Sequence, residues 1–309
     1  MTVNMPSPLG RVVATERRPN TPHEFHFWTA LDSPVGIGTI VRVDGRDSVN
    51  GVIPHVYGIV NEGFSWTDLA TPLHDVMGHD GQPGSQIAAT DRAEIRLYTA
   101  AVLRHIPEEP LQPVPMGTVF LADEADVHVA LRMDGYLKEG ARTGIPVGVY
   151  RAGGTDAPIY LDADFLLGPE AAHLNITGVS GLATKTSAVE WLLQSIFTHF
   201  PPQKGSIAAV CFNVKGPDLC FLDQPGVIDD ADRALYDQCG VPATPFGDVQ
   251  YYAPYKSDGV SLNTLRSNEA LLENVTSLTW GLREVLQYAE VLLNKDDIDA
   301  KADALIDFI

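Results

Sequence analysis

The 309-residue sequence predicts a mixed protein: a small N-terminal β-barrel, then a partial α/β core, then a helical segment. Three observations predict this order. Short apolar runs separated by Gly and Pro fill residues 1–165. A β-prone run, a loop of small residues and an amphipathic pattern follow one another between residues 173 and 200. Apolar residues then recur at helical spacing over 263–309. We therefore expect domains at 1–165, 166–262 and 263–309.

The first domain is expected to be a small antiparallel barrel or sandwich. Its apolar runs are short, they end at turn residues, and no long helical pattern interrupts them. The expected strands are Gly10–Ala14, Glu24–Ala30, Ile37–Val43, Val52–Val60, Arg92–Arg104, Gly117–Ala122, Val127–Arg132, Val147–Arg151 and Ile159–Leu161. Residues 71–85 are polar and rich in Gly and Pro, so we expect a loop there.

The second domain begins with the sequence features expected of a nucleoside triphosphate-binding loop. The run Leu174–Val179 enters a loop of small residues, and Lys185 and Thr186 then begin a helix. Backbone N–H groups of such a loop surround phosphate oxygens, and a helix N-terminus carries about half a positive charge. Lys185 would reach the outer phosphates of ATP, and the Thr186 hydroxyl would ligate Mg²⁺. The predicted nucleotide-binding residues are Gly178, Ser180, Gly181, Leu182, Ala183, Thr184, Lys185, Thr186 and Ser187.

The loop departs from the pattern G-x-x-x-x-G-K-[ST], because Val179 and Thr184 occupy its two glycine positions. A plain alternative is an ordinary strand-to-helix turn with a solvated Lys185. Context favours the nucleotide loop, since an apolar stripe with helical period follows it. The stripe consists of Val189, Leu192, Leu193, Ile196, Phe197 and Phe200. A second apolar run, Ser206–Val214, would complete a βαβ unit with a parallel sheet.

The composition disfavours nucleic-acid-binding, disulfide-rich, secreted and membrane proteins. There are 40 acidic and 21 basic residues, a net charge of −19, so the surface on average repels nucleic-acid backbones. Three cysteines without C-x-x-C spacing fit a reduced protein better than a disulfide framework or a zinc site. The N-terminus lacks the pattern of a secretory signal, and no long apolar run exists, so we expect a cytoplasmic protein without membrane association.

One further cluster offers metal ligands. His74, Asp75, His79 and Asp80 bring ring nitrogens and carboxylates close together in sequence. Such a cluster could hold an ion if further ligands joined it. An unrelated α/β enzyme with a metal site in residues 74–80 is therefore an alternative to the nucleotide-binding hypothesis.

Together these segments resemble the HerA-like branch of the HerA/FtsK P-loop ATPases. The matching stretches are Gly168–Ser187, Phe212–Asp223 and, in the barrel, Val35–Val43, Val56–Val60 and Ile145–Gly148. The resemblance implies a HAS-type barrel followed by a RecA-like ATPase core. It also implies that backbone N–H groups of residues 180–184 line the phosphate cradle, with Lys185 on the β- and γ-phosphates and Thr186 on Mg²⁺.

The chain departs from this family in its acidic motifs. Asn213 stands where many relatives have an acidic residue, whereas Lys215, Gly216 and Asp218 keep part of that motif. No apolar run ending in Asp-Glu follows residue 225, so the strand with the Walker B acidic pair is missing. Hydrolysis needs groups beyond the phosphate loop. We therefore expect ATP hydrolysis only if a C-terminal continuation or another subunit completes the core.

Two functions follow as expectations. In intact relatives, the resemblance implies a homo-oligomeric, hexameric ring that couples ATP hydrolysis to DNA translocation, with a nuclease or defence-system partner. The alternative is a non-catalytic assembly or partner-docking protein, in which the degenerate P-loop is structural. The acidic charge and the missing Walker B strand favour this alternative for the chain as it stands.

Overall fold

A computed structural model describes residues 7–45, 53–68, 71–79, 81–82, 94–138, 143–168, 172–178, 184–213, 218–256, 259–260 and 275–288. The chain forms two compact units, each assembled from separate stretches of sequence. The first unit contains Met1–Ile176, Trp191–Ile207 and Asp230–Pro242, and the second contains Thr177–Glu190, Ala208–Asp229 and Ala243–Ile309. Within the described ranges, no helix has the length and apolar character needed to cross a membrane.

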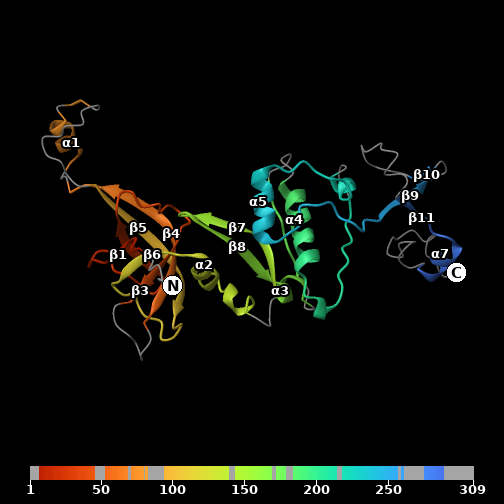
Figure 1. The fold of residues 1–309 in the computed structure, drawn as a ribbon, viewed down its shortest axis with the longest axis horizontal. Coiled ribbons are helices and arrows are strands. Elements are labelled where there is room, and N and C mark those ends of the chain that lie inside the picture. The colour runs from red at the N-terminus through yellow and green to blue at the C-terminus, as the bar shows by residue number, and fades with distance from the viewer. Residues whose placement is uncertain are drawn as a thin grey trace, which may run out of the picture. The chain divides into compact units, whose positions relative to one another are not determined.

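Six antiparallel strands close a barrel in the order β1-β2-β5-β4-β3-β6 (Figure 1). The strands are β1 (Gly10–Val13), β2 (Glu24–Thr29), β3 (Ile40–Asp44), β4 (His55–Trp66), β5 (Ile95–Ile106) and β6 (Thr118–Leu121). Closure leaves no unpaired sheet edge, which is how small all-β units avoid pairing with other chains. The prediction of an N-terminal barrel is confirmed.

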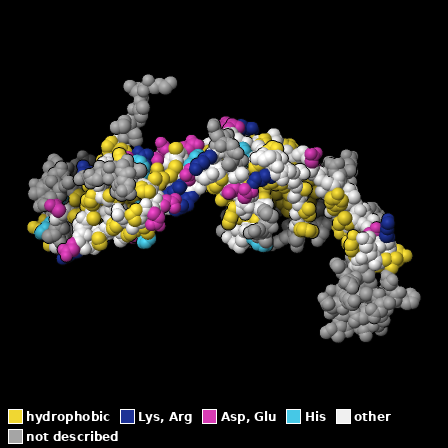
Figure 2. Space-filling view, turned by 90° about the horizontal axis from the view of Figure 1, so that it is seen from below, with side chains coloured by type: hydrophobic (Ala, Val, Ile, Leu, Met, Phe, Trp, Pro, Cys, Tyr) yellow, Lys and Arg dark blue, Asp and Glu magenta, His cyan; other side chains and the backbone are white. Residues whose placement is uncertain are grey.

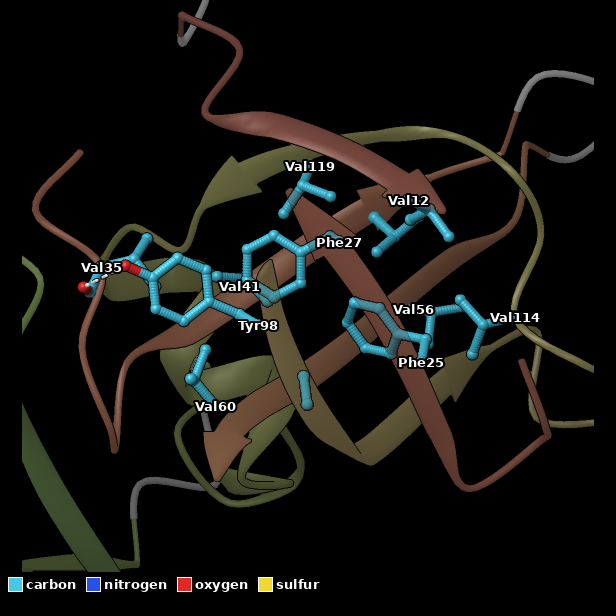
Figure 3. Packing of buried hydrophobic residues seen from close by; sticks show 12 residues of the cluster. Val12, Phe25, Phe27, Val35, Val41, Val56, Val60, Tyr98, Val114 and Val119 are labelled. Atoms are coloured by element: carbon cyan, nitrogen blue, oxygen red, sulfur yellow. Dashed lines mark hydrogen bonds between the residues drawn. The ribbon is translucent and has the colours of Figure 1, made fainter. Parts of the chain in front are cut away.

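The barrel is filled by side chains that alternate along each strand (Figure 3). Phe27 on β2 stacks on Tyr98 of β5 with ring centroids 5.5 Å apart, and the Tyr98 hydroxyl donates to the carbonyl of Val35. Gly58 on β4 lies against the ring of Phe25, where a Cβ would come within 2.5 Å of a ring carbon. The absence of a side chain at Gly58 therefore lets β4 pass over this aromatic core.

Two predictions for the barrel region are wrong. Val127–Arg132, predicted as a strand, lies mostly in helix α2 (Glu124–Ala130), because Asp123 and Asp126 form a capping box. The Asp123 carboxylate accepts from the Asp126 amide at 2.8 Å, which satisfies a free donor at the helix start. The predicted loop at 71–85 contains helix α1 (Pro72–Gly78), with proline at the favoured first position.

The barrel ends at Leu121, earlier than expected. The next two strands, β7 (Gly144–Ala152) and β8 (Thr155–Asp162), pair only with each other. They form a hairpin whose turn, Gly153-Gly154, has positive φ at both residues. Side chains of β8, α2 and the outer barrel face share a second apolar cluster, which includes Ile40, Tyr57, Val127, Met133 and Ala157.

Helices follow the hairpin. They are α3 (Ala163–Leu167), α4 (Thr184–His199) and α5 (Asp230–Cys239), with 3₁₀ turns at Pro202–Lys204 and Asp218–Phe221. A further 3₁₀ turn, Met133–Gly135, lies between α2 and β7. The helix predicted after Lys185 is therefore present. Within the first unit, α4 and α5 lie side by side, with Trp191 edge-on to Tyr236 at a centroid distance of 4.7 Å (Figure 1).

The two strands predicted on either side of this helix are not formed. Residues 172–178 and 205–213 have neither helix nor strand, and the sheet predicted from them is absent from the described residues. Val210 and Phe212 are 79% and 83% exposed. An apolar run indicates a preference for burial, but a strand also needs a hydrogen-bonding neighbour, and residues 206–212 have none among the described residues.

The second unit contains a small mixed sheet of order β10-β9-β11. Its strands are β9 (Tyr251–Lys256), β10 (Gly259–Val260) and β11 (Val275–Leu278), and helix α7 (Leu282–Gln287) follows. The predicted C-terminal helical segment is therefore wrong at 275–278, where pairing with β9 overrides the helical spacing. Gly281 caps α7 instead of interrupting a helix, since its N–H donates to Glu284 at 2.9 Å. Residues 263–274 and 289–309 of that prediction lie outside the described residues.

Candidate functional site

The predicted phosphate loop is described at its two ends. Lys185 lies in the first turn of α4 and is exposed, and its Nζ donates to the carbonyl of Gly178 at 3.0 Å. The intervening Ser180, Gly181, Leu182 and Ala183 lie outside the described residues. The hydrogen bond brings the lysine amine back to the point where the loop begins.

The electrostatics of this end of α4 favour an anion. The helix has 16 residues and no acidic residue in its first turn. Its aligned peptide dipoles place partial positive charge at the N-terminus of the helix. The Lys185 ammonium has three donors, of which the contact with Gly178 uses one. Thr186 is half-buried and Ser187 is exposed, in the same first turn, and Thr184 begins the helix.

Farther along the chain, α4 is anchored by apolar packing and a buried hydrogen bond within the first unit. Leu192, Ile196 and Phe200 pack with Ile145 and Ala163, which confirms part of the predicted stripe. The buried Ser195 hydroxyl donates to the carbonyl of Pro146. Phe197, a predicted member of the stripe, is 44% exposed. The Trp191 side chain packs on Tyr236, and its buried indole N–H has no partner among the described residues.

The residues compared with the family's acidic motif make other contacts. The Asn213 amide donates to Cys220 Sγ at 3.3 Å, and Asp223 accepts from the Tyr251 hydroxyl at 2.8 Å. Neither contact involves Lys185. Lys215 and Gly216 lie outside the described residues, and of Asp218 only the backbone, at the start of a 3₁₀ turn, is described.

The metal alternative finds no support in the described part of the chain. No group of three or more His, Cys, Asp and Glu residues there is arranged to hold an ion. His74 is exposed on α1, and His79 follows the end of that helix. Asp80 and the side chain of Asp75 lie outside what is described.

Sequence reasoning missed a charged network between the barrel and α2. Arg42 on β3 contacts Asp126 of α2 at 2.8 Å and Asp44 at 2.9 Å, and His55 also contacts Asp44. Burial opposes the charge of Arg42, but hydrogen bonds and charges from Asp126 and Asp44 outweigh it and raise the pKa of Arg42. Burial, together with the charge of Asp126, raises the pKa of Tyr57 to about 12. The capping pattern marks Asp126 in the sequence, but only the fold brings it to Arg42.

The barrel also carries two cavities, one near each end of β5. One has a volume of about 380 Å³ and is lined by His55, His105 and several prolines that follow β5. The other has a volume of about 530 Å³ and lies on the outer face, with aromatic residues of β2 and β4 in its lining. Sequence patterns did not point to either cavity.

No protein-family model matches this chain, and no curated protein sequence matches it either.

Proposed function

We propose that this chain binds Mg²⁺-ATP at the loop between Gly178 and Ser187. Lys185 contacts the β- and γ-phosphates, Thr186 ligates Mg²⁺, and backbone N–H groups of residues 180–184 line the cradle. The observation that carries the proposal is the position of the Lys185 amine, which turns back from the start of α4 to Gly178. A phosphate oxygen is charged and accepts more strongly than a carbonyl, so nucleotide would compete well for this amine.

Hydrolysis would need further groups. A carboxylate must position the attacking water, and positive charge must stabilise the transition state. The amide of Asn213 cannot serve as a base. We propose that a C-terminal continuation or another subunit supplies these groups, as in a HerA-like assembly. The complete assembly would be a cytoplasmic homo-oligomeric ring that couples ATP hydrolysis to DNA translocation, with a nuclease or defence-system partner.

Nucleotide titrations test the binding step. The purified chain is titrated with fluorescent ATP with and without Mg²⁺, alongside the variants Lys185→Ala and Lys138→Ala. Loss of a charge-assisted contact to phosphate costs about 1.5–3 kcal/mol, so we expect Lys185→Ala to weaken binding at least about tenfold. Lys138 is exposed and outside the loop, so its variant should bind like the wild type. Equal affinity of all three proteins, or no binding by any of them, rejects the proposal.

A non-catalytic assembly or docking function is the second candidate. It is favoured by large apolar side chains at the surface, among them Val210, Phe212, Trp28 and Trp66. Figure 2 shows that hydrophobic side chains reach the surface in several parts of the chain. Exposed apolar patches of this kind mark interaction surfaces. ATP binding that never leads to turnover, even with a completing subunit present, would favour this function.

A further inference from the structure

The outer face of the barrel has an apolar groove that no other described residue covers. Its lining includes Trp28, Phe64, Trp66, Ile95, Leu97 and Arg18. The strand register explains this composition, because Trp28 lies opposite Leu97, and Leu97 lies opposite Phe64. These three side chains form one row across β2, β5 and β4. Trp28 is 44% and Trp66 is 48% exposed.

Outward positions of a small barrel are normally polar unless something covers them. Elsewhere on this barrel the outward Ile40 and Tyr57 are covered by α2. No helix of the described part of the chain covers the groove in this way, and its volume of about 530 Å³ is in the range of a binding pocket. An aromatic groove of this kind therefore fits a ligand that is partly apolar.

The lining of the groove includes the cationic side chain of Arg18, although the whole chain is strongly acidic. Glu94, which accepts from Ser65 in the lining, is already paired with Arg96. The Arg18 guanidinium lies 5.1 Å from the centroid of the Phe64 ring, and Arg11 lies opposite Trp28. Arg11 and Arg18 are exposed, and neither forms an ion pair among the described residues. The groove thus favours a ligand that combines apolar groups with negative charge.

The chain itself has such a segment beyond the other end of β5. Residues 107–113 read Pro-Glu-Glu-Pro-Leu-Gln-Pro and are exposed. Proline rings pack against aromatic side chains and lose little conformational freedom on binding, which is why aromatic grooves recognise proline-rich peptides. Glu109 makes no ion pair within the described part of the chain. The proline rings and the Glu109 carboxylate therefore complement the aromatic floor and Arg18, whereas Glu108 is already paired with Arg104 and Arg132.

A chain is not expected to fill its own groove. Leu97 and Ile106 are nine residues apart on β5, a distance of roughly 30 Å along a strand. The segment is also fixed at its end by Val114, which is buried in the barrel core (Figure 3). The groove and residues 107–113 of one chain are therefore too far apart to bind each other.

We propose that the groove of one copy binds residues 107–113 of a second copy, so that barrels associate head to tail. Such an interface joins two different surfaces, and each added copy exposes a new groove at one end and a new segment at the other. Its repetition gives a closed ring or an open filament, depending on the rotation between copies. This association involves only the barrel and does not depend on nucleotide binding at Lys185.

Complementation between two variants tests the proposal. Trp66→Ala damages the groove but leaves the segment intact, and Glu109→Lys damages the segment but leaves the groove intact. In sedimentation velocity, the wild type should self-associate and each variant alone should remain monomeric. Mixing the two variants should give heterodimers that grow no further. The intact groove of the Glu109→Lys variant binds the intact segment of the Trp66→Ala variant, and the groove and segment left over are both damaged. Phe165→Ala, at a residue 84% exposed in α3, serves as the control and should associate like the wild type.

A synthetic peptide of residues 105–117 supplies a second measurement. It should change the tryptophan fluorescence of the Glu109→Lys variant, and Trp66→Ala should weaken its binding at least about tenfold, as expected for a central aromatic contact. A wild type that stays monomeric overturns the proposal, as does association that survives both variants. Binding of a single-stranded oligonucleotide in place of the peptide also overturns it. Lys185→Ala should leave every result unchanged, which separates this test from that of nucleotide binding.

Discussion

Tyr57 illustrates how one buried hydroxyl can report on the junction between the barrel and α2. It is 5% exposed, and its hydroxyl donates to Asp126 at 3.2 Å. Because its pKa is raised to about 12, the unfolded chain loses this proton first, and stability falls as pH rises from about 10 to 12. We expect Tyr57→Phe to cost about 1 kcal/mol at neutral pH and to lose less stability over that pH window.

Urea unfolding at a series of pH values measures both effects. Tyr252→Phe, at a tyrosine 61% exposed on β9, is the matched control and should follow the wild type throughout. If wild type and Tyr57→Phe declined in parallel between pH 10 and 12, the raised pKa would have no role in stability.

Individual residues were predictable where the local pattern is complete. Lys185 was expected at the start of a helix and lies there, because loop chemistry and helical spacing agree locally. Asp123 and Asp126 form a capping box that marks the start of α2, but the apolar residues that follow also fit a strand. The pairing of Arg42 with Asp126 joins residues 84 positions apart, so no local pattern could predict it.

Among the elements, the β7–β8 hairpin depends on its two glycines unequally. Gly153 and Gly154 both have positive φ, but a Cβ on Gly153 would lie 2.8 Å from side-chain atoms of Thr39 and Leu121. A Cβ on Gly154 meets open space. We expect Gly153→Ala to destabilise by about 2–3 kcal/mol, from backbone strain and crowding together, and Gly154→Ala by about 1 kcal/mol. Thermal unfolding measures the stability of both variants. Equal losses of stability would show that a Cβ at Gly153 does not clash with Thr39 and Leu121.

The predicted strands are present where the segment pairs with an antiparallel neighbour. All six barrel strands were expected, because short apolar runs between turn residues mark them, although β4 extends to Trp66, six residues past its predicted end at Val60. Ser206–Val214 has an equally apolar sequence but no neighbour among the described residues. Hydrophobic pattern therefore predicts which segments seek burial, and only the tertiary contacts decide whether a strand forms.

For the whole molecule, these differences predict an uneven distribution of stability. Backbone amides in β2 and β5 are paired on the closed barrel and flank its core, so they should open only on global unfolding. Residues 206–212 and 172–177 make no hydrogen bonds with other described residues, so their amides should exchange with solvent almost without protection. Hydrogen exchange read by mass spectrometry, over seconds to days, compares these peptides in one experiment.

The same measurement bears on the candidate site. Adding Mg²⁺-ATP should slow exchange at the start of α4 in the wild type and not in Lys185→Ala, while the amides of β2 and β5 remain unchanged. A completing subunit, if added, should protect residues 206–212, because their apolar side chains would then gain a sheet neighbour on which to pack. Strong protection of that segment in the isolated chain would mean that the predicted parallel sheet forms without any partner, and the argument for a completing subunit would fail.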